Sequence, residues 1–512
     1  MRCFALLSMT YLKLLLAITS GVLFALAFPN AAIGWLAFIA LLPLLVAIAR
    51  ARGAWQAFFL GWLSQTVAWL MMVPWVIRVM SHYGGLPELV GILLYTAMCM
   101  ILGLYGGAFA AIVKRLRLGA RFGPWLLVPL AWAAIEYART YLLTGFPWNL
   151  LATAIVDYTP LIQIDRFAGP YFVGSLILIP CTIAAWWITQ RPPQIARVIA
   201  GGAIGILALV WWGTGLVASK LIARPDDSPT FTAALLQPNI SQQMRWDEGQ
   251  VLTIYQRMIA MTEEAAKHGV QVVIWPESTV PLSFTETRFY RDSIEQLSRE
   301  RKIDIILGSV ATDPARPNRL WNSAFLISSG ITIGHYDKIR LVPFGEYVPL
   351  RRVLFFAQKL VREVGEFEFG TNDFPLGGKL KYGLAICYEI VYPQIPRQQM
   401  RHGADVLVTI TNDAWYDGTA APAQHLWQAR LRAVEDDRWL LRAGTTGISA
   451  HIDPTGRILQ SIPMGQPGII YARFQSRTTT TPYVRFGDWF AWASVLVVLI
   501  GLIYARRHAH PD

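Results

Sequence analysis

Three residues of the types that catalyse acyl transfer each follow an apolar run that is typical of a β-strand. Glu277 follows QVVIWP, Lys338 follows ITIGHYD, and Cys387 follows GLAI. A free thiol has a pKa of about 8.5, so it needs a base before it can attack a carbonyl group. A glutamate supplies that base, and a lysine stabilises the negative charge that develops on the attacked oxygen. Because catalytic groups of α/β folds collect at the carboxyl ends of strands, we expect these three side chains to meet.

Each of the three residues also has a structural explanation when it is taken alone. Cys387 could be a core residue, and Glu277 could cap a helix or start a loop. Lys338 could pair on the surface with Asp337 or Glu346. The other cysteines are Cys3, at the start of the chain, and Cys99 and Cys181, which lie within apolar runs. Cys387 is therefore the only cysteine of residues 228–475, and no disulfide is expected there.

Residues 228–475 alternate strand-like and helix-like segments. Helical patterns lie near 248–267, 286–301, 391–402 and 422–438. Strand patterns lie at 230–237, 271–275, 303–309, 322–328, 331–336, 380–387 and 405–411, and then near 444–452 and 457–461. The mixture of βα crossovers with adjacent strands predicts an α/β domain with two packed sheets.

The rest of the chain is strongly apolar. The 512 residues are 54% hydrophobic and only 15% charged, with a mean hydropathy of +0.39. Eight runs are long enough to span a bilayer: 10–28, 31–49, 55–78, 89–113, 124–143, 167–189, 197–218 and 486–505. We expect the first run to be an anchor rather than a signal peptide, because more spans follow it directly and no clear small-residue cleavage site is seen. The sequence predicts a membrane domain at 1–220, a globular domain at 228–475 and a last transmembrane helix at 486–507.

The positive charge marks orientation rather than nucleic-acid binding. The net charge is +12, but residues 228–475 carry 26 Lys and Arg against 25 Asp and Glu, with no basic stripe. Most of the excess lies in alternate loops between the apolar runs, which is the pattern of cytoplasmic loops. Both termini are therefore predicted to be cytoplasmic, and the globular domain, which follows seven spans, lies on the other side.

Four motifs in this order make the domain resemble the nitrilase superfamily. They are WPES at 275–278, HYDKIRLVPFGEYVP at 335–349, CYEIVYP at 387–393 and TNDAWY at 411–416. With eight spans around such a domain and GFPWN at 145–149, the whole chain resembles the apolipoprotein N-acyltransferase family, a membrane-bound branch of that superfamily. The resemblance implies a polytopic α-helical membrane domain with about eight transmembrane helices and an αββα sandwich.

The resemblance also implies a role for individual residues. Cys387 would be the nucleophile, Glu277 the general base and Lys338 the stabilising cation. The supporting residues would be Glu346, Tyr388, Glu389 and Trp246, and Asn412 is expected only to support a strand end through its side chain. We further expect Glu346 to hold the lysine charged and in place, whereas the sequence does not explain what Glu389 does.

The reaction implied by the family is the last step of lipoprotein maturation. A fatty acyl chain passes from a phospholipid, commonly phosphatidylethanolamine, through a cysteine thioester to the N-terminal amine of the diacylglyceryl-cysteine of an apolipoprotein. No cofactor and no metal are expected. The implied location is the bacterial inner membrane, with the catalytic domain in the periplasm.

Three other functions fit part of the sequence. A membrane-tethered amidase would use the same residues but would not need eight spans. A transporter with an accessory domain is disfavoured because the spans lack paired charges and matching broken repeats. A binding protein without activity would not need all three catalytic groups.

Two segments outside the motifs also stand out. Residues 351–369 mix Leu and Phe with Arg and Lys, which suits either an interfacial arm over the site or a buried amphipathic helix. Glu136 and Arg139, near the outer end of the fifth run, are spaced for an ion pair along one helix face.

Overall fold

The computed structural model describes residues 2–119, 122–223, 228–313, 316–347 and 367–508. The chain forms two compact units, each assembled from separated parts of the sequence. The first contains residues up to Arg78, Leu86–Ser219 and the chain from Phe486 onwards, and the second contains Val79–Gly85 and Lys220–Arg485. Most of the predicted arm at 351–369 lies outside the described residues.

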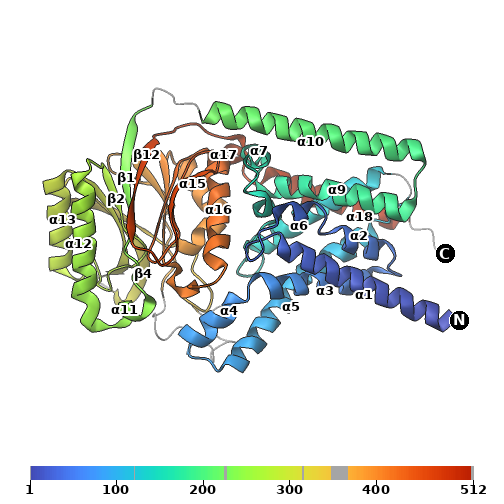
Figure 1. Ribbon diagram of the computed structural model, residues 1–512, viewed down its shortest axis with the longest axis horizontal. Helices are drawn as coiled ribbons and strands as arrows, with labels where there is room; N and C mark the ends of the chain where they lie inside the picture. Colours follow the sequence, from blue (N-terminus) through green and yellow to red (C-terminus); the bar gives the residue numbers. More distant parts are fainter. Residues whose placement is uncertain (1, 120–121, 224–227, 314–315, 348–366, 509–512) are drawn as a thin grey trace. The chain divides into compact units, whose positions relative to one another are not determined.

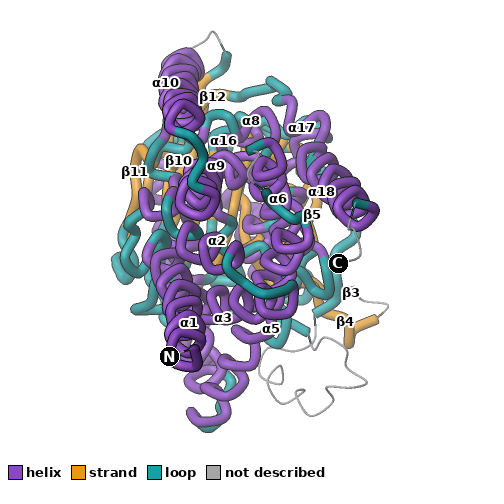
Figure 2. Tube along the Cα trace, turned by 90° about the vertical axis from the view of Figure 1, so that its right-hand side faces the viewer, coloured by secondary structure: helices purple, strands orange, loops and turns teal. Residues whose placement is uncertain are grey.

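The first unit is a helical bundle (Figures 1 and 2). Its helices are α1 (Arg2–Leu26), α2 (Leu42–Ala49), α3 (Ala54–Met72), α4 (Trp75–Arg78), α5 (Glu88–Arg115), α6 (Leu127–Tyr141), α7 (Thr159–Ile162), α8 (Asp165–Ala168), α9 (Pro170–Gln190), α10 (Gln194–Ile222) and α18 (Trp489–Arg507). Helix α3 packs between α1 and α5. The contact of α3 with α5 is close because a Cβ atom on Gly61 would lie 2.2 Å from the carbonyl oxygen of Gly106. Small residues at such crossings are typical of membrane helices.

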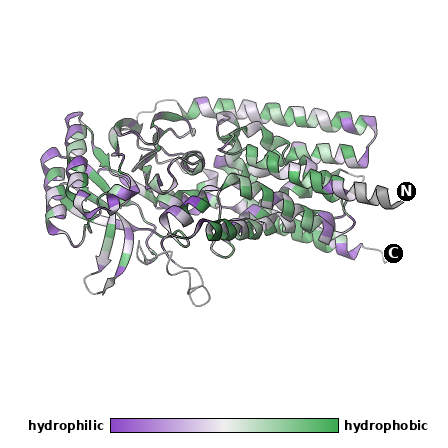
Figure 3. Ribbon diagram, turned by 60° about the horizontal axis from the view of Figure 1, so that its bottom comes forward, coloured by the Kyte–Doolittle hydropathy of each residue, from purple (hydrophilic) through white to green (hydrophobic). Residues whose placement is uncertain are grey.

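The helices of this unit are apolar on their outer surfaces as well (Figure 3). Four described helices, α5, α9, α10 and α18, are long and apolar enough to cross a membrane, and α3 with the bent segment Trp75–Tyr83 makes a fifth candidate. On α10 large apolar side chains such as Ile206 and Leu209 are exposed. Exposed apolar surface along whole helices fits a lipid environment, so the first unit is a membrane domain. A helix occurs in each of the eight predicted ranges.

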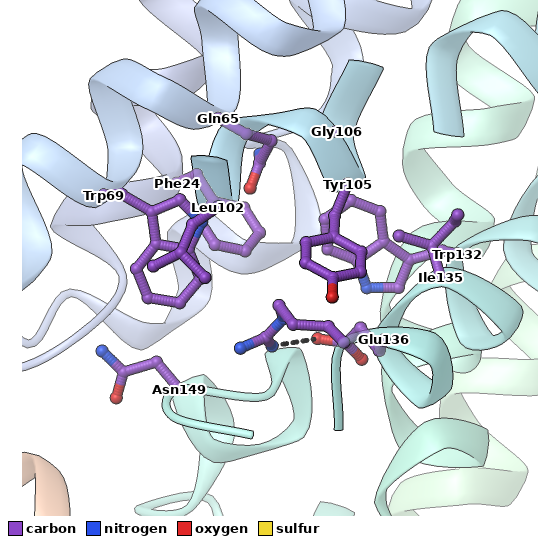
Figure 4. A pocket seen from close by; sticks show the side chains of 11 residues that line it. Phe24, Gln65, Trp69, Leu102, Tyr105, Gly106, Trp132, Ile135, Glu136 and Asn149 are labelled. Atoms are coloured by element: carbon purple, nitrogen blue, oxygen red, sulfur yellow. Dashed lines mark ion pairs between the residues drawn. The ribbon is translucent and has the colours of Figure 1, made fainter. Parts of the chain in front are cut away.

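A buried ion pair lies inside this bundle (Figure 4). Arg139 Nη2 lies 3.6 Å from Glu136 Oε1, as the helix spacing predicts. Arg139 also donates to the carbonyl oxygens of Phe146 and Trp148, while Glu136 accepts from the backbone N–H of Leu151. The pair therefore fastens the loop that contains GFPWN to α6. The adjoining cavity of about 20 Å³ holds roughly one water molecule and is far too small for an acyl chain.

The second unit is built on two six-stranded mixed sheets. The first has the strand order β12-β1-β2-β3-β4-β5, and the second has the order β11-β10-β9-β8-β7-β6. The first sheet consists of β1 (Thr230–Gln237), β2 (Val272–Ile274), β3 (Asp304–Asp313), β4 (Arg316–Ser328), β5 (Ile331–Asp337) and β12 (Gly468–Gln475). The second consists of β6 (Leu376–Gly377), β7 (Lys381–Ile386), β8 (Val406–Thr411), β9 (Leu440–Gly444), β10 (Ser449–Ile452) and β11 (Ile458–Ile462).

The two sheets pack face to face between two layers of helices, which gives the αββα sandwich. Buried residues of both sheets, among them Leu235, Ile274, Leu384 and Val408, form one core between them. Helices α12 (Val251–Lys267) and α13 (Arg288–Arg301) cover the outer face of the first sheet. Helices α15 (Gln394–Arg401) and α16 (Ala421–Asp436) cover the second. β1, β2 and β3 run parallel, as do β7, β8 and β9, so the carboxyl ends of these strands share one edge in each sheet.

Two differences from the predicted strands lie in the last part of the domain. The strand expected near 444–452 is two strands, β9 and β10, which are joined by a turn containing Gly447 at φ +129°. The edge strand β12 was not predicted, because GIIYARFQ buries few of its residues and lies among turn-forming residues. It pairs antiparallel with β1 and so completes the first sheet from the far end of the domain.

Candidate active site

The structure brings the predicted glutamate and lysine into direct contact. Glu277 follows β2 and Lys338 follows β5, both in the first sheet. Lys338 Nζ donates to Glu277 Oε1 at 3.2 Å and to Glu346 Oε1 at 2.9 Å. The Lys338 side chain is only 1% exposed, so this is a desolvated pair of salt bridges. Burial alone would lower the pKa of Lys338, but the two carboxylates raise it well above its usual value, and the lysine stays charged.

Glu277 is held as a carboxylate by donors on both of its oxygens. Oε1 also accepts from Asn322 Nδ2 at 2.7 Å, and Oε2 accepts from the backbone N–H of Asn412 at 2.9 Å. Burial would raise the pKa of Glu277, but Lys338 and these amide donors outweigh it and lower the pKa. An ionised glutamate in a dry site is suited to accept a proton.

Asn322 joins the two carboxylates and was not predicted. It donates from Nδ2 to both Glu277 and Glu346, the latter at 2.8 Å, while its backbone carbonyl oxygen accepts from the backbone N–H of Lys338. Glu346 also accepts from the backbone N–H of Val342 at 2.8 Å. The sequence signal was a lone amide inside the buried strand WNSAFLIS, where burying an unpaired polar group would be costly.

Cys387 follows β7 in the second sheet and interacts electrostatically with both Glu277 and Lys338. Its backbone is left-handed, with φ +51°, which costs a residue with a side chain about 1–2 kcal/mol. Burial raises the pKa of the Cys387 thiol, the Glu277 carboxylate raises it further, and Lys338 opposes them. The resting site therefore holds a thiol beside an ionised base, and the proton must leave as the thiol attacks.

A buried network holds the carbonyl of this strained cysteine. His425 Nε2 lies 3.0 Å from the Cys387 carbonyl oxygen, and Nδ1 lies 3.1 Å from Arg442 Nη2. Arg442 in turn binds Asp413 at 2.5 Å. Burial and the charge of Arg442 lower the pKa of His425, so the imidazole is neutral. Because a carbonyl can only accept, Nε2 carries a hydrogen, and Nδ1 lies 3.1 Å from both Arg442 Nη2 and Asp413 Oδ1.

Glu389 connects the lysine loop to the cysteine turn, which the sequence did not explain. It is fully buried, and its Oε1 accepts from the backbone N–H groups of Ile339 and Arg340 at 2.6 and 3.0 Å. Its Oε2 accepts from the backbone N–H of Ile386 at 2.8 Å, and Tyr336 donates its hydroxyl to the carboxylate. One side chain thus ties the residues after Lys338 to the residue before Cys387. Burial raises the pKa of Glu389 to about 7, against the opposing effect of these donors.

The remaining predicted residues border this centre. Tyr388 is buried, and its hydroxyl accepts from that of Tyr392 at 3.3 Å. Trp246, on the short helix α11 (Gln242–Trp246), is 42% exposed. Asn412 supports the end of β8 through its side chain, which accepts from the Ala414 N–H at 3.3 Å, and its backbone N–H in addition contacts Glu277.

Trp246 belongs to an aromatic cluster with a member from a distant part of the sequence. Its ring packs edge-on against Trp415 at 5.7 Å and Tyr83 at 6.0 Å, and Tyr83 lies 5.2 Å from Trp415. Tyr83 also donates its hydroxyl to the Ala414 carbonyl at 3.0 Å. Residues Val79–Gly85 are thus part of the catalytic unit, which no local sequence pattern indicates.

Comparisons with known proteins agree on both units. Residues 232–483 match the carbon-nitrogen hydrolase family, and residues 20–183 match the apolipoprotein N-acyltransferase N-terminal domain. The chain is 36% identical to the apolipoprotein N-acyltransferase of Geobacter metallireducens over 97% of its own length and 96% of that protein. It is 30% identical to the one from Methylococcus capsulatus, over 96% of each chain. Among solved structures, it resembles a mutant amidase of the nitrilase superfamily from Nesterenkonia, with 19% identity, 53% of this chain and 99% of that chain covered, and a TM-score of 0.40.

Proposed function

We propose that this chain, which belongs to the apolipoprotein N-acyltransferase family, transfers a fatty acyl chain from a phospholipid to the N-terminal amine of diacylglyceryl apolipoproteins. The observation that carries the proposal is the buried Glu277–Lys338 pair, whose charges interact with the buried thiol of Cys387, in a chain whose other unit is a membrane domain. The phospholipid donor is proposed to be phosphatidylethanolamine.

The first half-reaction forms a thioester on Cys387. Glu277 takes the thiol proton while sulfur attacks the ester carbonyl of the phospholipid, and the negative charge moves to the carbonyl oxygen. Lys338 and the backbone N–H of Tyr388 would stabilise that oxyanion. When the intermediate collapses, the bond to the glycerol oxygen breaks and Glu277 returns the proton to that oxygen. A lysophospholipid leaves, and the acyl chain remains on sulfur.

The second half-reaction makes the amide. The acceptor amine attacks the thioester, Glu277 accepts a proton from the amine nitrogen, and the thiolate leaves and takes the proton back. The enzyme is thereby restored, and an ester has been exchanged for an amide through a covalent intermediate. This exchange is downhill, so the step needs no energy-rich cosubstrate.

Glu346 and Glu389 would act as positioning residues. Lys338 contacts the base directly, and a second carboxylate at 2.9 Å keeps the ammonium from being drawn wholly onto Glu277. Glu389 holds the residues after Lys338 and the residue before Cys387 in fixed relative positions. Trp246 would line the entry for the lipid substrates.

The protein is a bacterial membrane protein, and the finer topology is proposed here. Residues 1–220 would form a membrane domain of seven spans, 228–475 the catalytic domain, and 486–507 an eighth span. The distribution of Lys and Arg supports cytoplasmic termini and a periplasmic catalytic domain in the inner membrane.

Intact-mass analysis of the full-length protein in detergent tests the acyl-enzyme. Incubation with phosphatidylethanolamine should add the mass of one acyl chain, hydroxylamine should remove it, and Cys387→Ala should never acquire it. An acceptor peptide with a diacylglyceryl-cysteine should discharge the adduct to an amide. If the adduct instead disappears equally fast in water alone, the protein is a hydrolase, and if no phospholipid gives an adduct, the proposed reaction is wrong.

A further inference from the structure

Arg245 lies on the face of α11 that is turned toward the catalytic base. Ser241 caps this short helix by accepting from the Met244 N–H at 3.2 Å. Gln242 is buried on the inner face, where its Oε1 accepts from Asn412 Nδ2 at 3.2 Å. Asn412 is the residue whose backbone N–H binds Glu277. Because residues three apart share one helix face, Arg245 extends from the same side as Gln242.

The aromatic cluster fixes the orientation of this helix. Trp246, the last residue of α11, is packed by Tyr83 and Trp415, and Tyr83 is itself tied to Ala414. Since the helix is held at both ends, the direction in which Arg245 extends is set by packing. The charges of Arg245 and Glu277 interact electrostatically in this arrangement.

The guanidinium of Arg245 has no partner within the described parts of the chain. No carboxylate or carbonyl oxygen of those residues lies within hydrogen-bonding distance of it, although its side chain is only partly exposed. Arg442, by contrast, binds Asp413, and Arg438 binds backbone carbonyls. A partly desolvated cation without a counter-ion is unfavourable by itself, so such a group is suited to bind an anion from outside.

Lys338, the other cation of the site, already has two carboxylate partners. Lys338 is shared by Glu277 and Glu346, so this cluster contains two carboxylates for one ammonium. An anionic substrate that approached them without a further cation would be repelled. Arg245 is the group that offsets this repulsion.

We propose that Arg245 binds the phosphate of the acyl donor, an inference that rests on the proposed phospholipid-dependent reaction. The planar guanidinium matches two phosphate oxygens with two parallel N–H donors. The glycerol backbone joins that phosphate to the acyl esters, so fixing the phosphate at Arg245 presents an ester carbonyl to Cys387. Arg245 thereby distinguishes phosphodiester lipids from neutral acyl esters.

The rival explanation is that Arg245 only helps to keep Glu277 ionised. In that case its loss would raise the pKa of the base and slow the attack on every ester to the same extent. The two explanations differ in whether the effect depends on the donor, and that dependence can be measured.

The test compares acyl-enzyme formation from two donors by full-length protein in one detergent. The donors are dipalmitoyl phosphatidylethanolamine and p-nitrophenyl palmitate, which carries no phosphate. In Arg245→Gln we expect the rate with the phospholipid to fall about 10- to 100-fold, the range for losing charge-assisted hydrogen bonds, while the rate with the neutral ester changes less than about twofold. The rate of Arg245→Lys with the phospholipid should lie between these values, since lysine keeps the positive charge but not the two parallel N–H donors.

The control is Arg301→Gln, which removes one exposed positive charge from α13 on the outer layer of the sandwich and should alter neither rate. Equal losses with both donors in Arg245→Gln, or no loss with the phospholipid, would overturn the assignment. The proposed function would fail in a different way, because wild-type protein would then acquire no acyl group from the phospholipid at all.

Discussion

The most demanding prediction concerns Glu389, the one carboxylate of the site whose need the sequence did not explain. Three backbone N–H groups and one tyrosine hydroxyl converge on it. In Glu389→Gln one oxygen is replaced by an NH₂ group, which meets a backbone N–H donor instead of accepting from it. The side-chain volume is almost unchanged, so the effect reports hydrogen bonding rather than a cavity.

The magnitude follows from counting the donors. If the remaining oxygen keeps Ile339 and Arg340, the N–H of Ile386 is left buried and unsatisfied, which costs about 1–3 kcal/mol. The surviving bonds also lose their charge assistance. Together these losses amount to about 3 kcal/mol. If they displace Lys338 from Cys387 in the transition state, acyl-enzyme formation slows about 100-fold.

The assay is the rate of acyl-enzyme formation by intact mass, measured beside the thermal midpoint of the protein. Glu300→Gln, an exposed residue of α13, is the matched control and should retain wild-type values in both. Glu389→Asp should also be slow, because the shorter side chain cannot reach both loops. If Glu389→Gln kept the wild-type rate and midpoint, the proposed connection between the two loops would be wrong.

Further predictions concern the cysteine, its support and pH. Replacing His425 by Leu should lower kcat about tenfold with KM unchanged, while Gln, which keeps an N–H donor for the Cys387 carbonyl, should retain most activity. Alkylation of Cys387 by iodoacetamide should still accelerate above about pH 9, where an ordinary thiol levels off, because the Cys387 pKa is raised; a plateau near pH 8.5 would contradict this. Acyl-enzyme formation should rise from about pH 6 to 8 as Glu389 (pKa about 7) ionises, and the same rise in Glu389→Gln would assign the titration to another group. Asn322→Leu should raise the apparent pKa of the base in the pH–rate profile by removing a donor from Glu277, and an unshifted profile would exclude that role.

The sequence predicted those residues of the site that belong to recognisable local patterns. Glu277, Lys338 and Cys387 each end an apolar strand, and catalytic groups of α/β folds collect at the carboxyl ends of strands, so their grouping could be anticipated. Most strands and the four large helices of the second unit were also predicted, because buried strands and amphipathic helices have distinct periods.

The residues that were missed act through contacts between distant segments. Asn322 and His425 are recognisable only as polar residues in buried elements, and their partners come from other strands. The role of Glu389 depends on backbone N–H groups about 50 residues away. Almost every residue has such a group, so the sequence does not show which of them bind Glu389. Tyr83 lies some 160 residues from Trp246, so no periodicity connects them.

The position of Tyr83 also constrains how the chain threads the bilayer. Tyr83 packs against Trp246 and Trp415, so residues 79–85 and the catalytic sandwich lie on the same side of the membrane. The chain between them must then cross an even number of times. Of the described helices in that interval, only α5, α9 and α10 are long and apolar enough by themselves, which is an odd number. We propose that α6 makes the fourth crossing: Glu136 and Arg139 depress its hydropathy, and their mutual pairing would allow a helix with two charges to traverse the membrane.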